Sequence, residues 1–145
     1  MIALIQRTTR AHVSVDKKTV AEIHQGIVAL ICMENNDTDI HFEKMLHKLV
    51  NYRIFEDQDG KMNLSLKDIN AELLLVPQFT LAANTEKGLR PSFSNACPPS
   101  IAQEKFSTFR TLALKGFQNT QCGIFGANMQ VTLTNDGPVT FWLKV

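Results

Sequence analysis

The sequence has few of the residues that cross-link small secreted proteins or hold zinc. It contains three cysteines, Cys32, Cys97 and Cys122, and no C-x-x-C pair. An odd number of widely spaced cysteines does not fit a disulfide framework, and no cysteine is spaced from a histidine as zinc ligands are. Because Cys32 lies in the apolar run GIVALICM, we expect it to be a buried, reduced thiol. The sequence therefore predicts neither disulfides nor a metal site.

Excess charge and long hydrophobic runs are also missing. Fifteen Lys and Arg against fourteen Asp and Glu leave a formal net charge of +1. Tight nucleic-acid binders usually carry a basic excess, so composition neither indicates nor excludes RNA, although a local pair such as Lys87 and Arg90 could meet a phosphate. No apolar stretch approaches the roughly 18 residues that span a bilayer, and the opening MIALIQRTTR lacks signal-peptide features. We expect a cytoplasmic protein with no membrane partner.

Conventional catalytic motifs are absent as well. There is no G-x-S-x-G, H-E-x-x-H, P-loop or G-x-G-x-x-G motif. The four histidines all precede residue 50 and stand in dissimilar surroundings, so a Ser/His/Asp or Cys/His triad is not indicated. The segment FEDQDGKMNLSL resembles a calcium loop only superficially, because it lacks the ligand pattern with a terminal Glu.

What the sequence does contain is the hydrophobic pattern of one α/β domain over residues 1–145. Alternating or continuous apolar runs predict strands at residues 2–8 with Val13 and Val15, at 20–23, at 27–33 and at 73–76. Helical spacing of apolar residues predicts one helix from Phe42 to Val50 and a second after Pro98-Pro99-Ser100. We expect mixed or antiparallel β-sheets in layers with these two helices.

Two loops complete the pattern. Residues 82–99 are polar and interrupted by glycine and proline, and a loop of this length inside a compact domain is often functional. Two alternating runs, at residues 129–133 and 139–145, flank Asn135-Asp136-Gly137-Pro138. That arrangement predicts a C-terminal β-hairpin.

Two segments are candidates for a functional site. Pro77-Gln78-Phe79-Thr80-Leu81 follows a buried strand, and ligands tend to lie at strand ends in α/β sheets. The run Asn135 to Thr140 reads N-D-G-P-V-T, in which a cis Gly137-Pro138 bond would present two backbone carbonyls without a side chain. Each segment alone also fits a structural role, as core residues in the first case and as a turn in the second.

Taken together, the two segments resemble bacterial D-aminoacyl-tRNA deacylases, which were formerly called D-tyrosyl-tRNA deacylases. The resemblance covers the whole chain and includes MIALIQR, YRIFEDQDGKMN, QFTLAANTEKGLRPSFS and MQVTLTNDGPVTFWLKV. It implies a hydrolase that cleaves the ester of D-aminoacyl-tRNA and of glycyl-tRNA, a proofreading step in translation. It also implies a cytoplasmic homodimer that uses no cofactor and no metal and binds the 3′ end of aminoacyl-tRNA.

The resemblance assigns roles to six residues. Gly137 and Pro138 would form a cis unit that enters the partner subunit's pocket, holds the substrate's α-ammonium and leaves no room for an L side chain, with Arg7 holding the loop. Gln78, Phe79 and Thr80 would line the site for the terminal adenosine and the ester carbonyl, with backbone N–H groups near Phe79 as oxyanion donors. The family's proposed mechanism uses the 2′-OH of the RNA. Thr80 has been regarded as a nucleophile, but we favour a positioning role.

One position departs from the family pattern: this chain has Pro77 where S-Q-F-T-L is usual. Proline there resembles animal deacylases with relaxed chiral rejection and a trans Gly-Pro bond, whereas Phe79, Arg7 and N-D-G-P-V-T match the chirality-strict branch. The alternatives are therefore an editing deacylase that also clears some L-aminoacyl-tRNAs and a non-catalytic dimeric nucleic-acid-binding module. A third is a cysteine hydrolase using Cys97 or Cys122.

Overall fold

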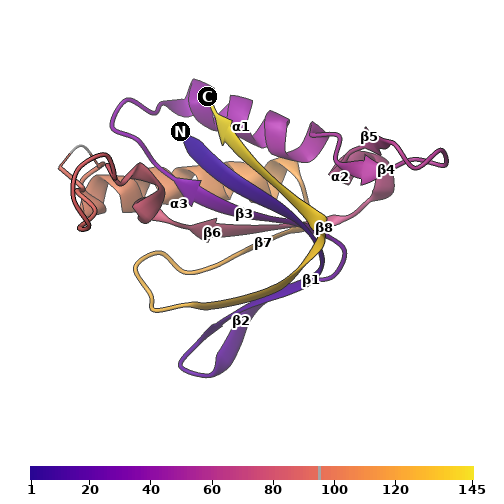
Figure 1. Cartoon of the computed structure of the whole chain (residues 1–145), viewed down its shortest axis with the longest axis horizontal. Helices are drawn as coiled ribbons and strands as arrows, with labels where there is room; N and C mark the ends of the chain where they lie inside the picture. Colours follow the sequence, from indigo (N-terminus) through magenta and orange to yellow (C-terminus); the bar gives the residue numbers. More distant parts are fainter. Residues whose placement is uncertain (95) are drawn as a thin grey trace.

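One mixed β-sheet organises the chain, with two long helices packed on one of its faces (Figure 1). The structure is a computed structural model that describes residues 1–94 and 96–145. In chain order its elements are β1 (Ile2–Val15), β2 (Lys18–Ile23), β3 (Gly26–Cys32), α1 (Asp39–Asn51), β4 (Phe55–Glu56), β5 (Met62–Leu64), α2 (Leu66–Ile69), β6 (Glu72–Pro77), the 3₁₀ turn η1 (Phe79–Ala82), α3 (Pro99–Gly116), β7 (Thr120–Cys122) and β8 (Gln130–Lys144).

The sheet confirms the predicted strands and the α/β class. Its order is β2-β1-β3-β6-β7, and β8 pairs with β1. Antiparallel pairing joins β1 to β2, β3 and β8, whereas β3–β6 and β6–β7 are parallel. The continuous apolar run that begins at Ile27 forms β3, which lies centrally and is buried along nearly its whole length. A strand covered on both faces needs apolar side chains in both directions, which explains the run.

The two predicted helices are present and bury the predicted faces. Thr38 is the N-cap residue of α1, and its backbone N–H donates to His41 Nδ1 at 3.1 Å. The core sides of the helices meet at Phe42 of α1 and Phe109 of α3, whose ring centroids lie 6.1 Å apart. The expectation of two helices omitted α2, a single turn whose N-cap Ser65 accepts a hydrogen bond from Asp68 N–H.

The predicted C-terminal hairpin is wrong. Residues 130–144 form one strand, β8, and both of its halves pair with β1, at Gln130–Asn135 and at Thr140–Lys144. β1 is long enough to pair with both halves, and β8 bends sharply between them (Figure 1). The segment between the halves is therefore a bulge opposite Arg7, where register shifts interrupt the ladder.

The bend curls the sheet around a second core on the face away from the helices. This core contains residues of five strands and Met129, which directly precedes β8: Ala11, Val13, Ala21, Ile23, Val28, Leu74 and Val76 are buried, with Leu30, Met129, Val131 and Leu133 packed against them. The sheet is thus covered on both sides of β3 and β6. Over the described residues, no helix is long and apolar enough to cross a membrane.

Candidate functional site

The first candidate segment forms a tight turn at the carboxyl end of β6. The Gln78 N–H donates to the Ile31 carbonyl at 2.7 Å, which extends the parallel pairing of β3 and β6 by one residue. The chain then turns into η1, and the Gln78 side-chain amide donates to the hydroxyl of Thr80. Phe79 is 58% exposed, and its ring lies 5.3 Å from that of Phe93. The turn therefore presents an aromatic surface and exposed backbone at the strand end.

Cys32 contacts the backbone of this turn from the end of β3. Its thiol has two carbonyl acceptors within hydrogen-bond distance, that of Met33 at 3.6 Å and that of Phe79 at 3.7 Å, and the backbone of Ala82 also bonds the sulfur. Burial and the nearby Glu34 carboxylate raise the pKa of Cys32 to about 11. The predicted buried, reduced thiol is confirmed, and its protonated state suits a structural hydrogen-bond donor rather than a nucleophile.

The second candidate segment is the bulge of β8. Gly137 and Pro138 are exposed, and the peptide bond between them is cis. Gly137 has φ = +137°, and a Cβ placed on it would lie 2.6 Å from Val139 Cγ2 and 3.0 Å from Val139 N. Only glycine fits this backbone without displacing its neighbours.

Arg7 holds the bulge from the buried side. The side chain is 7% exposed, and its Nε donates to the Asp136 carbonyl at 3.0 Å and pairs with Asp136 Oδ2 at 3.1 Å. Its second nitrogen donates to the Ile54 carbonyl at 2.7 Å, which ties the bulge to the chain after α1. A planar guanidinium bonded in two directions has little freedom to move, so the bulge is anchored to the body of the domain.

Asn135 belongs to the N-D-G-P-V-T motif, but the sequence alone predicted no separate role for it. The Asn135 Oδ1 accepts from Val139 N–H at 2.7 Å, and its Nδ2 donates to Thr140 Oγ1 at 2.9 Å. Gln6 of β1 donates to the same hydroxyl at 3.3 Å. Asn135 thus closes the four-residue bulge on itself. The available signal was an Asn placed immediately before a Gly-Pro bend, a position where Asn side chains often bond the backbone.

The structure does not bring the two segments together within one chain. Gln78 bonds Ile31, which pairs with Ala3, whereas Gly137 lies opposite Arg7. Four residues along β1 and three strand spacings therefore separate them, a distance of about 20 Å. Figure 1 agrees, because the chain after β6 runs to the left of the view while β8 bends on the right.

Among the described residues, no histidine forms a hydrogen bond with either segment. His24 contacts Glu72, His41 contacts Thr38 and His47 contacts Asn51, while His12 lies in β1 opposite Glu22. Burial raises the pKa of Cys97 and of Cys122, so these thiols are protonated at neutral pH. Within residues 1–94 and 96–145, no three His, Cys, Asp or Glu residues are grouped so that they could hold a metal ion.

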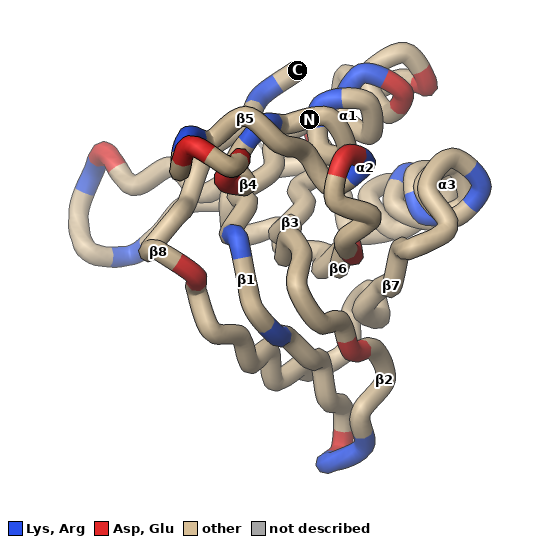
Figure 2. The backbone as a smooth tube through the Cα atoms, turned by 90° about the vertical axis from the view of Figure 1, so that its right-hand side faces the viewer, with Lys and Arg blue, Asp and Glu red and all other residues tan. Residues whose placement is uncertain are grey.

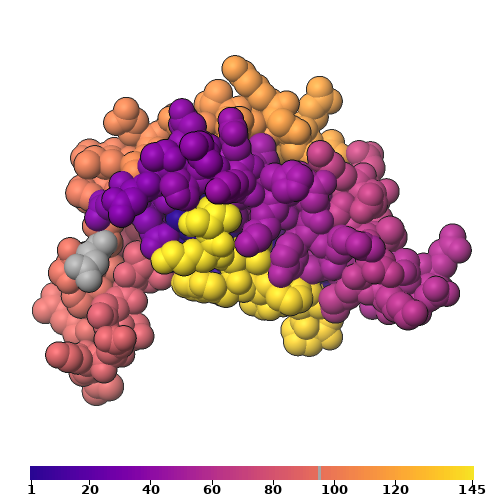
Figure 3. All heavy atoms as spheres, turned by 90° about the horizontal axis from the view of Figure 1, so that it is seen from above, coloured from indigo at the N-terminus to yellow at the C-terminus, as the bar shows by residue number. Residues whose placement is uncertain are grey.

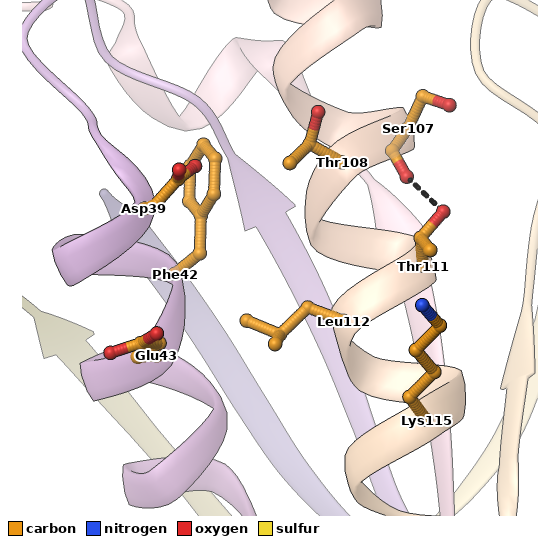
Figure 4. Close-up of a pocket in the computed structure, with 8 residues that line it drawn as sticks. All are labelled: Asp39, Phe42, Glu43, Ser107, Thr108, Thr111, Leu112 and Lys115. Atoms are coloured by element: carbon orange, nitrogen blue, oxygen red, sulfur yellow. Dashed lines mark hydrogen bonds between the residues drawn. The ribbon is translucent and has the colours of Figure 1, made fainter.

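A separate hollow lies between α1 and α3 (Figure 4). It has a volume of about 460 Å³, and in the close-up Phe42 and Leu112 lie between the two helices. Thr111 Oγ1 donates to the Ser107 carbonyl at 3.0 Å, so this hydroxyl is occupied within its own helix. None of the predicted site residues lines the hollow. It has no paired nucleophile and base, and we do not assign it a function.

The fold and these two segments define an α/β domain whose candidate site is built mainly from backbone groups, and comparison with known proteins identifies the family. The family described as D-Tyr-tRNA(Tyr) deacylase matches residues 4–144, and the chain belongs to it. The chain is 59% identical over 145 residues to a D-aminoacyl-tRNA deacylase of Francisella tularensis subsp. novicida, with all of both sequences covered. It is 58% identical over 144 residues to one of Legionella pneumophila, covering 99% of each.

Solved structures agree with the fold. A structure titled c-Myc DNA Unwinding Element Binding Protein matches with a TM-score of 0.94 and 38% identity, covering 100% of this chain and 99% of that one. A probable eukaryotic D-amino acid tRNA deacylase matches with a TM-score of 0.87 at 15% identity, covering 99% and 98%. The second likeness supports the fold alone, whereas the first extends to sequence.

Proposed function

We propose that this chain hydrolyses the ester of D-aminoacyl-tRNA, and that of glycyl-tRNA, in the cytoplasm. The observation that carries the proposal is the exposed, side-chain-free Gly137-Pro138 bulge, held by Arg7 and Asn135, in a member of the D-Tyr-tRNA(Tyr) deacylase family. Such a projection recognises a ligand by backbone shape. That suits a choice between mirror-image amino acids, which differ only in the direction of a side chain.

The working site combines segments of two copies of the chain. The separation of about 20 Å between Gln78 and Gly137 within one copy exceeds the size of an aminoacyl group. In a symmetric dimer the bulge of one copy can reach η1 of the other, and twofold symmetry then creates two equal sites. β8 supports this arrangement, because among the described strands it pairs with β1 alone and it carries Trp142, which is 51% exposed.

Chiral selection follows from the position of the bulge. The carbonyl oxygens of Gly137 and Pro138 accept hydrogen bonds from the substrate's α-ammonium. When that group is fixed, a D side chain points away from the bulge and an L side chain points into it. Because Arg7, Asp136 and Asn135 hold the bulge, it does not yield, and the L-isomer is rejected by steric exclusion. Glycine has no side chain to reject and is hydrolysed.

The chemistry rests on backbone groups and the substrate. Backbone N–H groups around Phe79, at the start of η1, stabilise the oxyanion as water attacks the ester carbonyl. The 2′-OH of the terminal adenosine assists the water. Thr80 positions the turn, because its hydroxyl is bonded to the Gln78 amide, which is no base. The reaction as proposed uses neither cofactor nor metal.

Relaxed chirality is the nearest alternative, and Pro77 is its only support. A non-catalytic nucleic-acid-binding module is less well supported, because the net charge of +1 provides little phosphate affinity. The printed title of the 38% identical structure names DNA binding for that protein.

The decisive experiment compares matched D-Tyr-tRNA, L-Tyr-tRNA and Gly-tRNA. We expect loss of the D-tyrosyl and glycyl esters while the L-tyrosyl ester persists. Equal loss of both tyrosyl esters would refute chiral rejection, and no loss of any ester would favour the binding module. Sedimentation equilibrium tests the dimer separately, and a monomeric active enzyme would contradict the two-copy site.

A further inference from the structure

The loop after η1 contains an ordered projection, which we call the 84–92 finger. Asn84 N–H donates to the Ser92 carbonyl at 2.8 Å, and Ser92 N–H donates back to Asn84 at 3.0 Å, so the two ends are paired like a short hairpin. The Asn84 side chain also accepts from Glu86 N–H at 2.9 Å. Figure 3 shows this part of the chain, in the colours around residues 80 to 92, projecting from one corner of the molecule.

The base of the finger is built into the candidate site. Ala83 N–H donates to the Thr80 carbonyl at 3.1 Å, so the finger begins where η1 ends. On the returning strand, the Phe93 ring packs against Phe79. A ligand whose reacting end lies at Phe79 must therefore pass close to the finger as it leaves the site.

The finger carries two cations that have no ion-pair partner among residues 1–94 and 96–145. Lys87 and Arg90 are exposed, and neither forms an ion pair with any described residue. Arg10 on β1, in contrast, is paired with Glu22. Basic and acidic positions are interspersed over the backbone (Figure 2), and the finger itself also contains Glu86. Two unpaired cations on a projection beside the site are suited to an anion supplied from outside.

We propose that Lys87 and Arg90 bind phosphates of the single-stranded 3′ end of tRNA, in the nucleotides just before the terminal adenosine. The inference rests on the proposed function, which places the esterified adenosine at η1. A hairpin arm of four residues reaches about 13 Å, which corresponds to about four nucleotides of a stacked strand. The finger thus gives the enzyme a local RNA contact that its near-zero net charge does not provide.

The test compares two substrates of the full-length enzyme: D-Tyr-tRNA and the D-tyrosyl ester of adenosine, which lacks the preceding phosphates. For the double variant Lys87→Ala and Arg90→Ala, we expect KM for D-Tyr-tRNA to rise about tenfold, since two exposed charge contacts are lost. The slope of log kcat/KM against log salt should become shallower by about 1.4, the value for two single-strand phosphates. Hydrolysis of the adenosine ester should be unchanged.

Two further variants make the result specific to charge and position. Glu86→Gln removes the acidic group of the finger, so we expect a lower KM for D-Tyr-tRNA. Lys17→Ala with Lys18→Ala removes the same charge from two exposed residues, in the β1–β2 turn and at the start of β2, and should leave the salt slope unchanged. An unchanged slope in the finger variant would overturn the proposal, and so would an equal loss on the adenosine ester, because that would mean a structural role in the site.

The failure of the proposed function would be distinguishable. If the unmodified enzyme hydrolyses neither ester, the deacylase assignment fails. The finger is then tested by fluorescence anisotropy with a labelled oligonucleotide matching the 3′ end of tRNA. Weaker, less salt-dependent binding by the finger variant would support the phosphate contact, and equal binding would refute it.

Discussion

Replacing Gly137 with alanine tests the idea that backbone shape, and no side chain, performs the selection. The added Cβ would lie 2.6 Å from Val139 Cγ2 and 3.0 Å from the Val139 nitrogen, in a residue with φ = +137°. A rotation of Val139 can relieve the first contact, but the second involves backbone. The bulge must therefore shift as a whole, against the hydrogen bonds from Arg7 and Asn135.

The size of the effect follows from that shift. Strain at a positive φ costs about 1–3 kcal/mol, and a displacement of about 1 Å in a positioning group costs about 100-fold in rate. We expect kcat/KM for D-Tyr-tRNA to fall about 100-fold, equivalent to about 2.7 kcal/mol of transition-state stabilisation. Because Gly137 is exposed, the domain should remain folded.

Gly60→Ala is the matched control. Gly60 also has a positive φ, +73°, but a Cβ there would meet nothing within 4 Å, and the residue lies in the β4–β5 turn. It therefore also places an alanine at a positive φ, but without the contact with Val139. Single-turnover deacylation and thermal unfolding should be measured for both variants. A folded Gly137→Ala enzyme within threefold of the unmodified rate would refute the reasoning.

Three other expectations follow from contacts near the two segments. Thr80→Ala should keep activity within about tenfold, because among the described residues its hydroxyl bonds the Gln78 amide alone; total inactivity with an intact fold would return Thr80 to a covalent role. Asn135→Ala should lower kcat/KM about tenfold, and Asn135→Asp, which keeps the acceptor for Val139 N–H, should recover most of it; equal rates for the two would contradict a closing role. Cys32 has a pKa raised to about 11, so its thiolate fraction at pH 7.5 is about 1 in 3,000. Alkylation of Cys32 by iodoacetamide, measured by mass spectrometry, should therefore be slow and should accelerate as pH rises. Rapid modification at pH 7.5 would show that this thiol is ionised.

The sequence predicts local structure best where one hydrophobic period is uninterrupted. The run from Ile27 is apolar on both faces of a central strand, and the stripe from Phe42 to Val50 is buried along α1, both as expected. The single-turn helix α2 was missed because four residues are too few to show a period. Its Ser65 and Asp68 pairing was the available signal.

The C-terminal error has a different origin. A turn motif between two alternating runs predicts a hairpin only if the two runs pair with each other. Here β1 offers a longer partner from Ile2 to Val15, and each run gains more by extending along it. Gly137 and Pro138 then leave the ladder as a bulge rather than reversing the chain. The local sequence predicts the bend at Gly137-Pro138. It does not reveal that β1 is available to pair with both runs, because that depends on the tertiary structure.

In the candidate site, too, the local motifs could be predicted from the sequence, whereas the contacts between distant segments could not. The residue types at Gln78 to Thr80 and at Gly137-Pro138 were identifiable, because their motifs resemble those of a known family. The support of the bulge by Ile54 and Asn135, and of η1 by Cys32, depends on how distant segments pack. The separation of the two segments within one chain is likewise visible only in the folded sheet.

Pro77 occupies a position in the sheet that tolerates proline. It is the last residue of β6, opposite Ile31, and a proline at a strand end removes no N–H that the following pairing needs. The next residue, Gln78, still bonds the Ile31 carbonyl, so η1 begins at the same level of the sheet. Pro77 is therefore compatible with the end of β6 and with the hydrogen bond that places η1. In the proposed two-copy site, the bulge that meets η1 comes from the other copy, and chirality is set by the backbone of that bulge at Gly137-Pro138. Relaxed selectivity would therefore require the bulge to shift, against the hydrogen bonds from Arg7 and Asn135.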